Sequence, residues 1–288
     1  MGILSGRTAF ITGGSRGIGR AIGLRLAKEG ANVVLAAKTS DPHPKLPGTI
    51  HSVAEEVQQA GGKALAVQCD VRFEESVQAA IDEAVKTFSG IDILINNAGA
   101  ISPTSLDDTP VKKFDLMLGI NARAVFVCTK LALPHLQKSG AAGRHPHVLS
   151  MSPPVRLETK WIAGISPYTM TKYGMSIMTL GFAEELREDK IAVNALWPRS
   201  VVASAALEML LGDDAKHSRT PEIMADAACE IVTTKDLALT GQTVLDEELL
   251  VKRGYTDFAK YQNMPGEEIW ADFYVDGYGE GALKPMLK

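Results

Sequence analysis

The sequence has few of the residues that build disulfide, metal or nucleic-acid sites. It has 3 cysteines in 288 residues, Cys69, Cys128 and Cys229, and none of them belongs to a Cys-x-x-Cys pair. We therefore expect reduced core thiols and no metal site. The net charge is −4, without the basic excess typical of nucleic-acid-binding proteins. This charge argues against a nucleic-acid partner.

Long hydrophobic runs and targeting signals are also missing. No uninterrupted apolar run approaches the roughly 18 residues that span a bilayer, and the start, Met1–Arg7, is too short and polar for a signal peptide. Hydrophobic residues make up 45% and charged residues 22% of the chain, as in ordinary soluble proteins. We expect a cytoplasmic protein with no membrane partner.

Short apolar runs rich in β-branched residues alternate with longer amphipathic stretches. The expected strands are Thr8–Thr12, Asn32–Ala37, Lys63–Cys69, Ile91–Asn96, His147–Met151, Ile191–Leu196 and Thr243–Leu245. The expected helices are Ile18–Lys28, Ile50–Gln59, Glu74–Phe88, one within Val111–Gln137, Pro167–Arg187 and one near Pro221–Thr233. This alternation predicts an α/β fold with a doubly wound parallel sheet, which binds ligands beyond the carboxyl ends of its strands.

Residues 1–246 carry this pattern and form one predicted domain, and residues 247–288 form a C-terminal extension. The extension is rich in aromatic residues: Tyr255, Phe258, Tyr261, Trp270, Phe273, Tyr274 and Tyr278. Such a composition indicates a packed segment rather than a disordered tail. Packing on its own domain, contact with a neighbouring subunit and a lid over the substrate all remain open.

A glycine-rich turn, Thr12–Gly19, joins the first predicted strand to the first helix. Glycines let a backbone approach a pyrophosphate, and the helix N-terminus offers free N–H groups to the phosphates. The turn therefore predicts a dinucleotide site, although its Gly-x-x-x-Gly-x-Gly spacing differs from the common fingerprint.

The second strand ends at Ala37-Lys38 without the carboxylate that usually binds the ribose hydroxyls of NAD. Lys38 and Arg16 are placed to meet the extra phosphate of NADP, so NADP is favoured over NAD. The alternative is a solvated Lys38 and an Arg16 that touches phosphates common to both cofactors. Asp70, at the end of the third strand, is expected to bind the adenine amino group or to cap the next helix.

Tyr168 and Lys172 lie at positions i and i+4 and therefore on one face of a helix. A free phenol is a poor base at neutral pH, but a neighbouring cation favours the phenolate and lowers the phenol pKa. Such a phenol can exchange a proton with an alcohol or a carbonyl. We expect Lys172, with the oxidised nicotinamide ring, to lower the pKa of Tyr168 in this way.

Several segments match the motifs of one known family: Thr12–Gly19, Asn96–Gly99, Asn121, Tyr168-x-x-x-Lys172 and Thr240–Gln242. Together they resemble the short-chain dehydrogenase/reductase family. The resemblance implies a Rossmann-type fold, a nicotinamide cofactor and a homodimer or homotetramer built through the long helices. It also implies that Asn121 lies in a helix kink and holds a proton relay. Other segments, among them Ser152-Pro153-Pro154 and Ala192–Pro198, resemble the hydroxysteroid-dehydrogenase-like group and bacterial relatives described as citronellol or citronellal dehydrogenases.

The sequence departs from the family pattern at two places. The family's serine, thirteen residues before the tyrosine, is replaced by Val155, and the nearest hydroxyl at the strand end is Ser152, sixteen residues before Tyr168. We expect Ser152 to polarise the substrate oxygen, with Ser150 as the alternative and Tyr168 alone as a third possibility. Arg199 replaces a usual glycine, and solvent, a phosphate or a polar substrate group are its possible neighbours.

These patterns predict an NADP(H)-dependent oxidoreductase acting on an alcohol or carbonyl of a mostly apolar small molecule, such as a terpenoid, a steroid-like or a fatty compound. The alternative is a nucleotide-binding sensor or partner-binding protein with little catalysis. The expected catalytic residues are Tyr168, Lys172, Ser152 and Asn121. The expected cofactor-binding residues are Gly13, Ser15, Arg16, Gly17, Ile18, Gly19, Lys38, Asp70, Val71, Asn97, Ala98, Gly99, Tyr168, Lys172, Pro198 and Val201.

Overall fold

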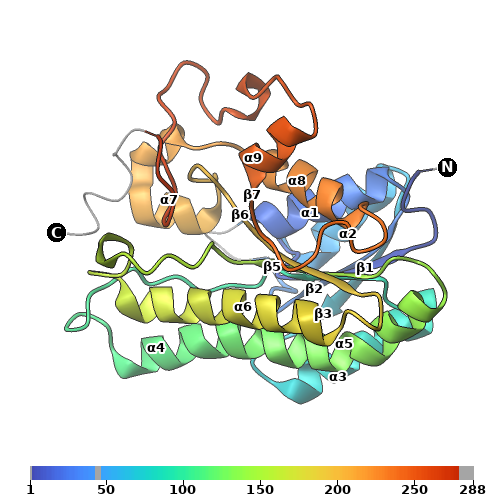
Figure 1. Ribbon diagram of the computed structural model, residues 1–288. Coiled ribbons are helices and arrows are strands. Elements are labelled where there is room, and N and C mark those ends of the chain that lie inside the picture. The colour runs from blue at the N-terminus through green and yellow to red at the C-terminus, as the bar shows by residue number, and fades with distance from the viewer. Residues whose placement is uncertain (1, 43–46, 279–288) are drawn as a thin grey trace.

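A seven-stranded parallel sheet forms the centre of the computed structural model, which describes residues 2–42 and 47–278 (Figure 1). The strands are β1 (Thr8–Thr12), β2 (Asn32–Ala37), β3 (Lys63–Gln68), β4 (Ile93–Asn96), β5 (His147–Met151), β6 (Ala192–Trp197) and β7 (Thr243–Leu245). Their order is β3-β2-β1-β4-β5-β6-β7, which reverses between β1 and β4. This doubly wound order confirms the predicted Rossmann-type sheet and puts a topological switch point at the ends of β1 and β4.

Helices cover both faces of the sheet. They are α1 (Gly17–Lys28), α2 (Ile50–Gln59), α3 (Glu74–Phe88), α4 (Val111–Leu118), α5 (Ala124–Ala141), α6 (Ser166–Glu185), α7 (Ala205–Leu211), α8 (Glu222–Val232) and α9 (Asp246–Lys252). Figure 1 shows α1, α2, α8 and α9 above the sheet, with α3, α5 and α6 below it. A π turn at Gly119–Arg123 interrupts the long helix expected within Val111–Gln137.

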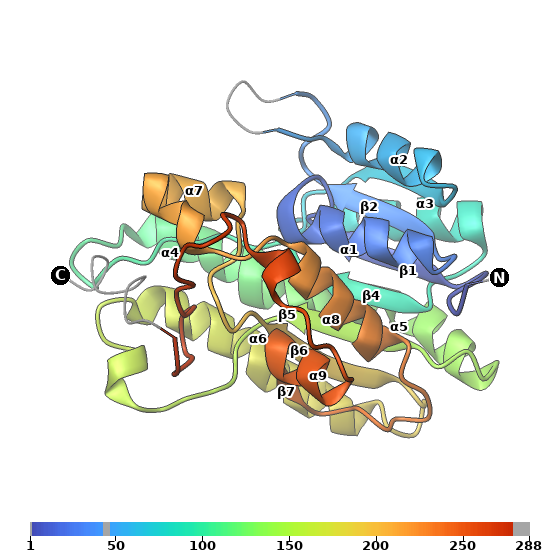
Figure 2. The same cartoon turned by 90° about the horizontal axis from the view of Figure 1, so that it is seen from above.

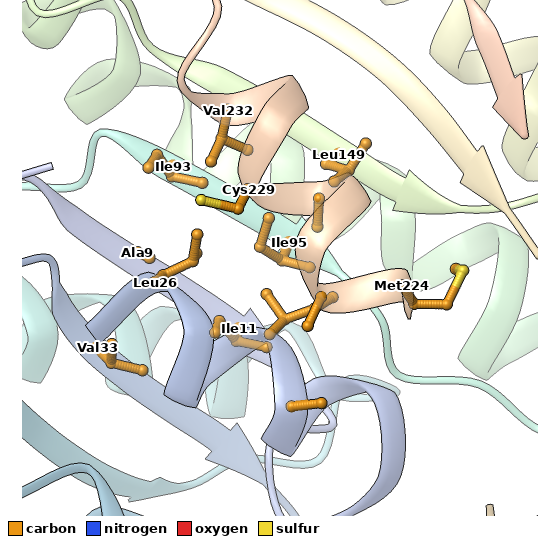
Figure 3. Close-up of a cluster of buried hydrophobic side chains, with 14 of the residues drawn as sticks. Ala9, Ile11, Leu26, Val33, Ile93, Ile95, Leu149, Met224, Cys229 and Val232 are labelled. Atoms are coloured by element: carbon orange, nitrogen blue, oxygen red, sulfur yellow. The ribbon is translucent and has the colours of Figure 1, made fainter. Parts of the chain in front are cut away.

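Alternate strand residues face opposite layers, as the period of two in a strand requires. In β1, Ala9 and Ile11 face the cluster formed with α1 and α8 (Figure 3), whereas Phe10 faces the cluster formed with α3 and α5. Both faces are therefore buried, which explains why the central strands read as continuous apolar runs. All three cysteines are free, and all three lie in these cores.

The described part of the extension packs on its own domain. Leu249, Leu250 and Tyr261 join the core on the α8 face, and the Tyr261 hydroxyl donates to Asp226 at 2.6 Å. Farther along, Phe273 and Tyr274 pack with side chains at the carboxyl edge of the sheet. Figure 2 shows the dark red segment running between α6 and α7. Residues 43–46 of the Pro-rich loop and 279–288 of the extension lie outside the described residues.

The helical run over residues 111–141 is long and apolar enough to cross a bilayer by length and composition. Charged residues such as Lys112, Asp115 and Lys130 interrupt this run, so no unbroken apolar stretch predicted it. Half of its most apolar window is buried inside the fold, where Val127 and Cys128 of α5 pack on the sheet. Such burial is typical of a core helix.

Candidate functional site

Two adjoining cavities lie at the carboxyl ends of the strands, at the switch point. The larger, of about 520 Å³, follows the glycine-rich turn and the ends of β2 and β3. The smaller, of about 230 Å³, lies by the ends of β4, β5 and β6. The residues that line both are Ile18, Asn97, Gly99, Ser204 and Ala206. A ligand in one cavity therefore borders a ligand in the other.

Gly13 and Gly17 line the larger cavity, and Gly19 lies buried beside them. Gly13 (φ +69°) and Gly17 (φ +53°) adopt the left-handed conformation that favours glycine. A Cβ atom on Gly19 would lie 2.4 Å from the Gly13 carbonyl oxygen. Gly19 is buried and does not line the cavity, so in this structure it permits close packing of α1 on the turn.

A network of hydrogen bonds joins this turn to the end of β4. The Thr12 hydroxyl accepts the N–H groups of Asn97 and Ala98, both at 3.0 Å. The Asn97 amide in turn donates to the carbonyls of Thr12 and Gly13 at 3.0 and 3.1 Å. This network places Asn97, Ala98 and Gly99 on the wall of the larger cavity, and their binding of a cofactor stays a prediction.

Cations dominate the far end of the larger cavity. Arg16, Lys38 and Arg72 line it, and Asp70 is the one acidic residue on its wall among the described part of the chain. Arg72 holds both carboxyl oxygens of Asp70 and, together with Lys38, lowers the pKa of that carboxyl. Asp70 therefore neither caps α3 nor stands free, and Arg72 is a site residue that the sequence analysis missed. Ser15, Ile18 and Val71 also line this cavity.

Tyr168 and Lys172 emerge from one face of α6 into the smaller cavity. They are 3% and 6% exposed. The Lys172 ammonium donates to the Met151 carbonyl at 2.9 Å and lies 5.2 Å from the centre of the Trp197 ring. Burial lowers the pKa of Lys172 to about 8.

The protonation of Tyr168 differs from the expectation. Burial, with smaller contributions from Tyr274 and Asp272, raises the pKa of the phenol well above its usual value. Lys172 is not among the causes of this shift, so the expected depression by its ammonium is absent. Desolvation therefore favours the neutral phenol.

Asn121 lies in the π turn and is fully buried. Its side chain donates to the Ala100 carbonyl and to the Thr171 hydroxyl, both at 2.9 Å, and it accepts the Ala100 N–H at 2.8 Å. It therefore joins the loop after β4 to α6, next to the residue that precedes Lys172.

Ser150 and Ser152 are both fully buried, and neither lines either cavity. Each hydroxyl lacks a hydrogen-bond partner among the described residues. Met151, between them, lines the smaller cavity instead. The structure therefore does not bring Ser152 to the cavity wall, contrary to the expectation that it faces Tyr168. The carbonyl of Pro153 accepts the Ser176 hydroxyl of α6 at 2.6 Å, which holds the chain leaving β5 against that helix.

The turn after β6 also differs from the expectation. Pro198 and Val201 line the smaller cavity, but the Val201 N–H donates to Trp270 at 3.0 Å, and the Val201 carbonyl accepts the Arg219 N–H at 2.9 Å. The extension thus occupies the backbone N–H of Val201, one of the residues expected to bind the cofactor. Arg199 contacts the extension too, with its guanidinium 5.4 Å from the centre of the Tyr278 ring.

The extension adds Asp272 and Phe273 to the smaller cavity, and the sequence analysis identified neither. The Phe273 ring lies 6.1 Å from that of Tyr168. Enclosure in the cavity wall raises the pKa of Asp272 to about 8. No motif or spacing connects residue 272 to Tyr168, because a loop contact alone brings them together.

Comparisons with known proteins identify relatives of this chain. Residues 7–210 match the family model described as short chain dehydrogenase. The chain is 51% identical to "Hydroxysteroid dehydrogenase-like protein 2" of Danio rerio, over 99% of this chain and 68% of that protein. It is 48% identical to the Homo sapiens protein of the same name, over 99% and 67%. The chain thus spans about two thirds of these relatives.

Solved structures show the same similarity. A putative dehydrogenase from Xanthomonas campestris superposes with a TM-score of 0.91 at 48% identity, covering 95% of this chain and 99% of that one. A short chain dehydrogenase from Burkholderia cenocepacia J2315 in complex with NADP has a TM-score of 0.71 at 29% identity, covering 84% and 96%.

The raised pKa of Asp272 makes stability depend on pH. Between pH 3.8 and about 8, the folded protein holds a proton that the unfolded chain has released, so this group lowers the free energy of unfolding as pH rises. We expect Asp272→Asn to gain stability relative to the unmodified protein across this window, by at most about 1.4 kcal/mol per pH unit, and to gain no more above it. Urea unfolding of both proteins from pH 4 to 9 measures the difference. A difference independent of pH would contradict this prediction.

Proposed function

The chain belongs to the short-chain dehydrogenase/reductase family, and from this premise we propose that it is an NADP(H)-dependent oxidoreductase that interconverts an alcohol and a carbonyl on a mostly apolar small molecule. One observation carries the proposal. Tyr168 and Lys172 line an apolar cavity that shares a wall with a cavity built on the glycine-rich turn. A proton-exchanging phenol therefore borders the dinucleotide site.

The residues around the larger cavity fit a dinucleotide. Gly13 and Gly17 leave the backbone open to a pyrophosphate, and α1 begins at Gly17 with its free N–H groups toward that turn. When bound, the nicotinamide supplies or accepts the hydride. Pro198 and Val201 border the ring site through their side chains, since the Val201 backbone is engaged with the extension.

Tyr168 acts on the oxygen of the substrate. Its raised pKa keeps the phenol protonated at neutral pH, so it is ready to donate a proton to a carbonyl oxygen during reduction. Lys172, whose pKa is lowered to about 8, exchanges protons near neutral pH, and Asn121 holds the helix turn beside it. In alcohol oxidation the phenol first passes its own proton towards Lys172, and the resulting phenolate then accepts the proton of the alcohol.

Charge supports NADP over NAD. Three cations and one carboxylate line the larger cavity, and the carboxylate of Asp70 is already paired with Arg72. Lys38, at the end of β2, is exposed and free to meet a 2′-phosphate. The Burkholderia relative, whose structure contains NADP, adds support.

The wall of the smaller cavity favours an apolar substrate. Leu207, Leu210 and Leu211 of the α7 region, with Met224 of α8, give it an apolar surface. We further propose a homodimer or homotetramer, because the large side chains of Phe126, Ile177 and Leu180 are 42–62% exposed on α5 and α6.

Removing the phenolic hydroxyl tests the reaction. Tyr168→Phe is expected to bind NADPH with nearly unchanged affinity and to lose turnover by at least about 100-fold, since proton transfer by a positioned group contributes this much. Tyr274→Phe is the control, because it removes a buried hydroxyl that bonds Thr169 and does not line the cavity. Turnover is followed by NADPH absorbance over terpenoid, steroid and fatty alcohols and carbonyls. Near-normal turnover of Tyr168→Phe would refute the assignment.

Removing a cation tests the cofactor preference. Lys38→Ala is expected to weaken NADPH binding roughly tenfold and NADH binding much less, because a charge-assisted hydrogen bond contributes about 1.5–3 kcal/mol. Lys63→Ala is the matched control for the loss of an exposed lysine. Lys63 begins β3, at the edge of the sheet away from the cavity, whereas Lys38 follows the end of β2. Calorimetric titration measures both affinities. Equal losses for the two cofactors would overturn the preference.

A further inference from the structure

The extension is fastened to the turn after β6 by backbone hydrogen bonds. Asp272 N–H donates to the Arg199 carbonyl at 3.2 Å, and Val201 N–H donates to the Trp270 carbonyl at 3.0 Å, forming an antiparallel bridge. The Trp197 indole then donates to the Phe273 carbonyl at 2.9 Å. These bonds hold Asp272 and Phe273 at the wall of the smaller cavity, which Trp197 of β6 and Tyr168 of α6 also line.

The polar side chains on the wall of this cavity are Asn97, Tyr168, Lys172, Ser204 and Asp272. Four of these side chains make structural hydrogen bonds or take part in the proposed reaction. Asn97 holds the carbonyls of Thr12 and Gly13, and the Ser204 hydroxyl caps α7 by accepting the Leu207 N–H at 3.2 Å. Tyr168 and Lys172 belong to the proposed reaction. Asp272 is the side chain without an assigned task.

One carboxyl oxygen of Asp272 is unused. Oδ1 accepts the Phe273 N–H at 2.6 Å, whereas Oδ2 makes no hydrogen bond or ion pair with any described residue. An acidic group enclosed in an apolar cavity is costly unless it is paired. Asp92, which lies away from the cavity, uses both oxygens with Ser139, Arg144 and Thr8, whereas Asp272 combines an unused oxygen with a place on the cavity wall.

We propose that Asp272 determines substrate specificity, with Oδ2 hydrogen-bonding a hydroxyl group of the substrate other than the reacting oxygen. This inference rests on the proposed function, and it narrows the substrate class to apolar alcohols or carbonyls that carry a second hydroxyl. The raised pKa of Asp272 favours a neutral carboxyl group at pH 7, and such a group can both donate a hydrogen bond to a hydroxyl and accept one from it. The ammonium of Lys172 in the same cavity disfavours a cationic substrate group.

Asp272 lies beyond residues 7–210, which match the family model. Structures with 26–30% identity cover 84% of this chain, whereas those with 48% identity cover 95–96%. The selectivity proposed here therefore belongs to chains that carry the extension rather than to the dehydrogenase domain in general.

Matched ketones test the proposal. The substrates are 3- and 4-hydroxycyclohexanone, each compared with the methylcyclohexanone of the same substitution, because methyl and hydroxyl are similar in size. The unmodified protein is expected to prefer each hydroxyl compound in kcat/KM. Asp272→Leu is expected to lose about tenfold or more on the hydroxyl compounds, since a site built to bond a hydroxyl loses that much when the partner is removed. Because Asp272 also contributes to the pKa of Tyr168, a change common to both compounds is removed by taking the ratio of kcat/KM within each pair. This ratio should fall about tenfold or more in Asp272→Leu, and Asp272→Asn should recover most of it.

Three outcomes would overturn the proposal: no preference by the unmodified protein, equal losses on both members of a pair, or no loss in Asp272→Leu. The preference of the unmodified protein is measured without any variant, so this comparison can still overturn the proposal if a variant fails to fold. Calorimetric titration of the same pairs into Tyr168→Phe with NADP⁺, in which the second hydroxyl is not oxidised because the proton-exchanging phenol is missing, measures the preference as binding. If none of these ketones is reduced, the binding difference still decides the role of Asp272, and the wider panel of terpenoid, steroid and fatty compounds separately decides the proposed function.

Discussion

The hydrogen bonds between Thr12 and Asn97 are the interaction on which the site depends. They join the turn after β1 to the segment after β4, across the point where the strand order reverses. Thr12 is 1% exposed, so these bonds form away from competing water. They place the two cavities on opposite sides of one wall, which brings a dinucleotide and a substrate side by side. A parallel sheet collects its functional groups at one edge, and this network sets their spacing.

Burial governs the protonation of the catalytic pair. The pKa of Tyr168 rises and that of Lys172 falls, and in both cases desolvation is the largest cause. Each shift favours the neutral form of its group. The simple expectation of a cation lowering the pKa of its neighbour considers only the pair and omits the cost of enclosing both groups under Trp197 and Phe273. The protonation states of Tyr168 and Lys172 therefore depend on the whole cavity and not on the pair alone.

The C-terminal extension forms part of the wall of the smaller cavity. It binds the backbone of Val201, contacts Arg199, and adds Asp272 and Phe273 to the wall. Arg219, which is 5% exposed, anchors the extension through Glu247 and the Tyr278 hydroxyl. The glycine usual after Pro198 would not offer such a contact, so Arg199 and the extension form one structural unit. The extension therefore replaces solvent at one side of the substrate cavity.

Local patterns in the sequence determined the sheet, its helices, the glycine-rich turn and the shared face of Tyr168 and Lys172, because each depends on neighbours a few residues apart. The strand limits differ from the predicted ones by at most two residues, at β4. Only the tertiary structure decided that neither Ser150 nor Ser152 lines the cavity, that the Val201 N–H is engaged and where Asp272 lies. The last two features depend on contacts between residues about seventy positions apart, as in the hydrogen bond from Trp197 to Phe273. No local periodicity records such contacts, since they form only when the extension folds back over the sheet.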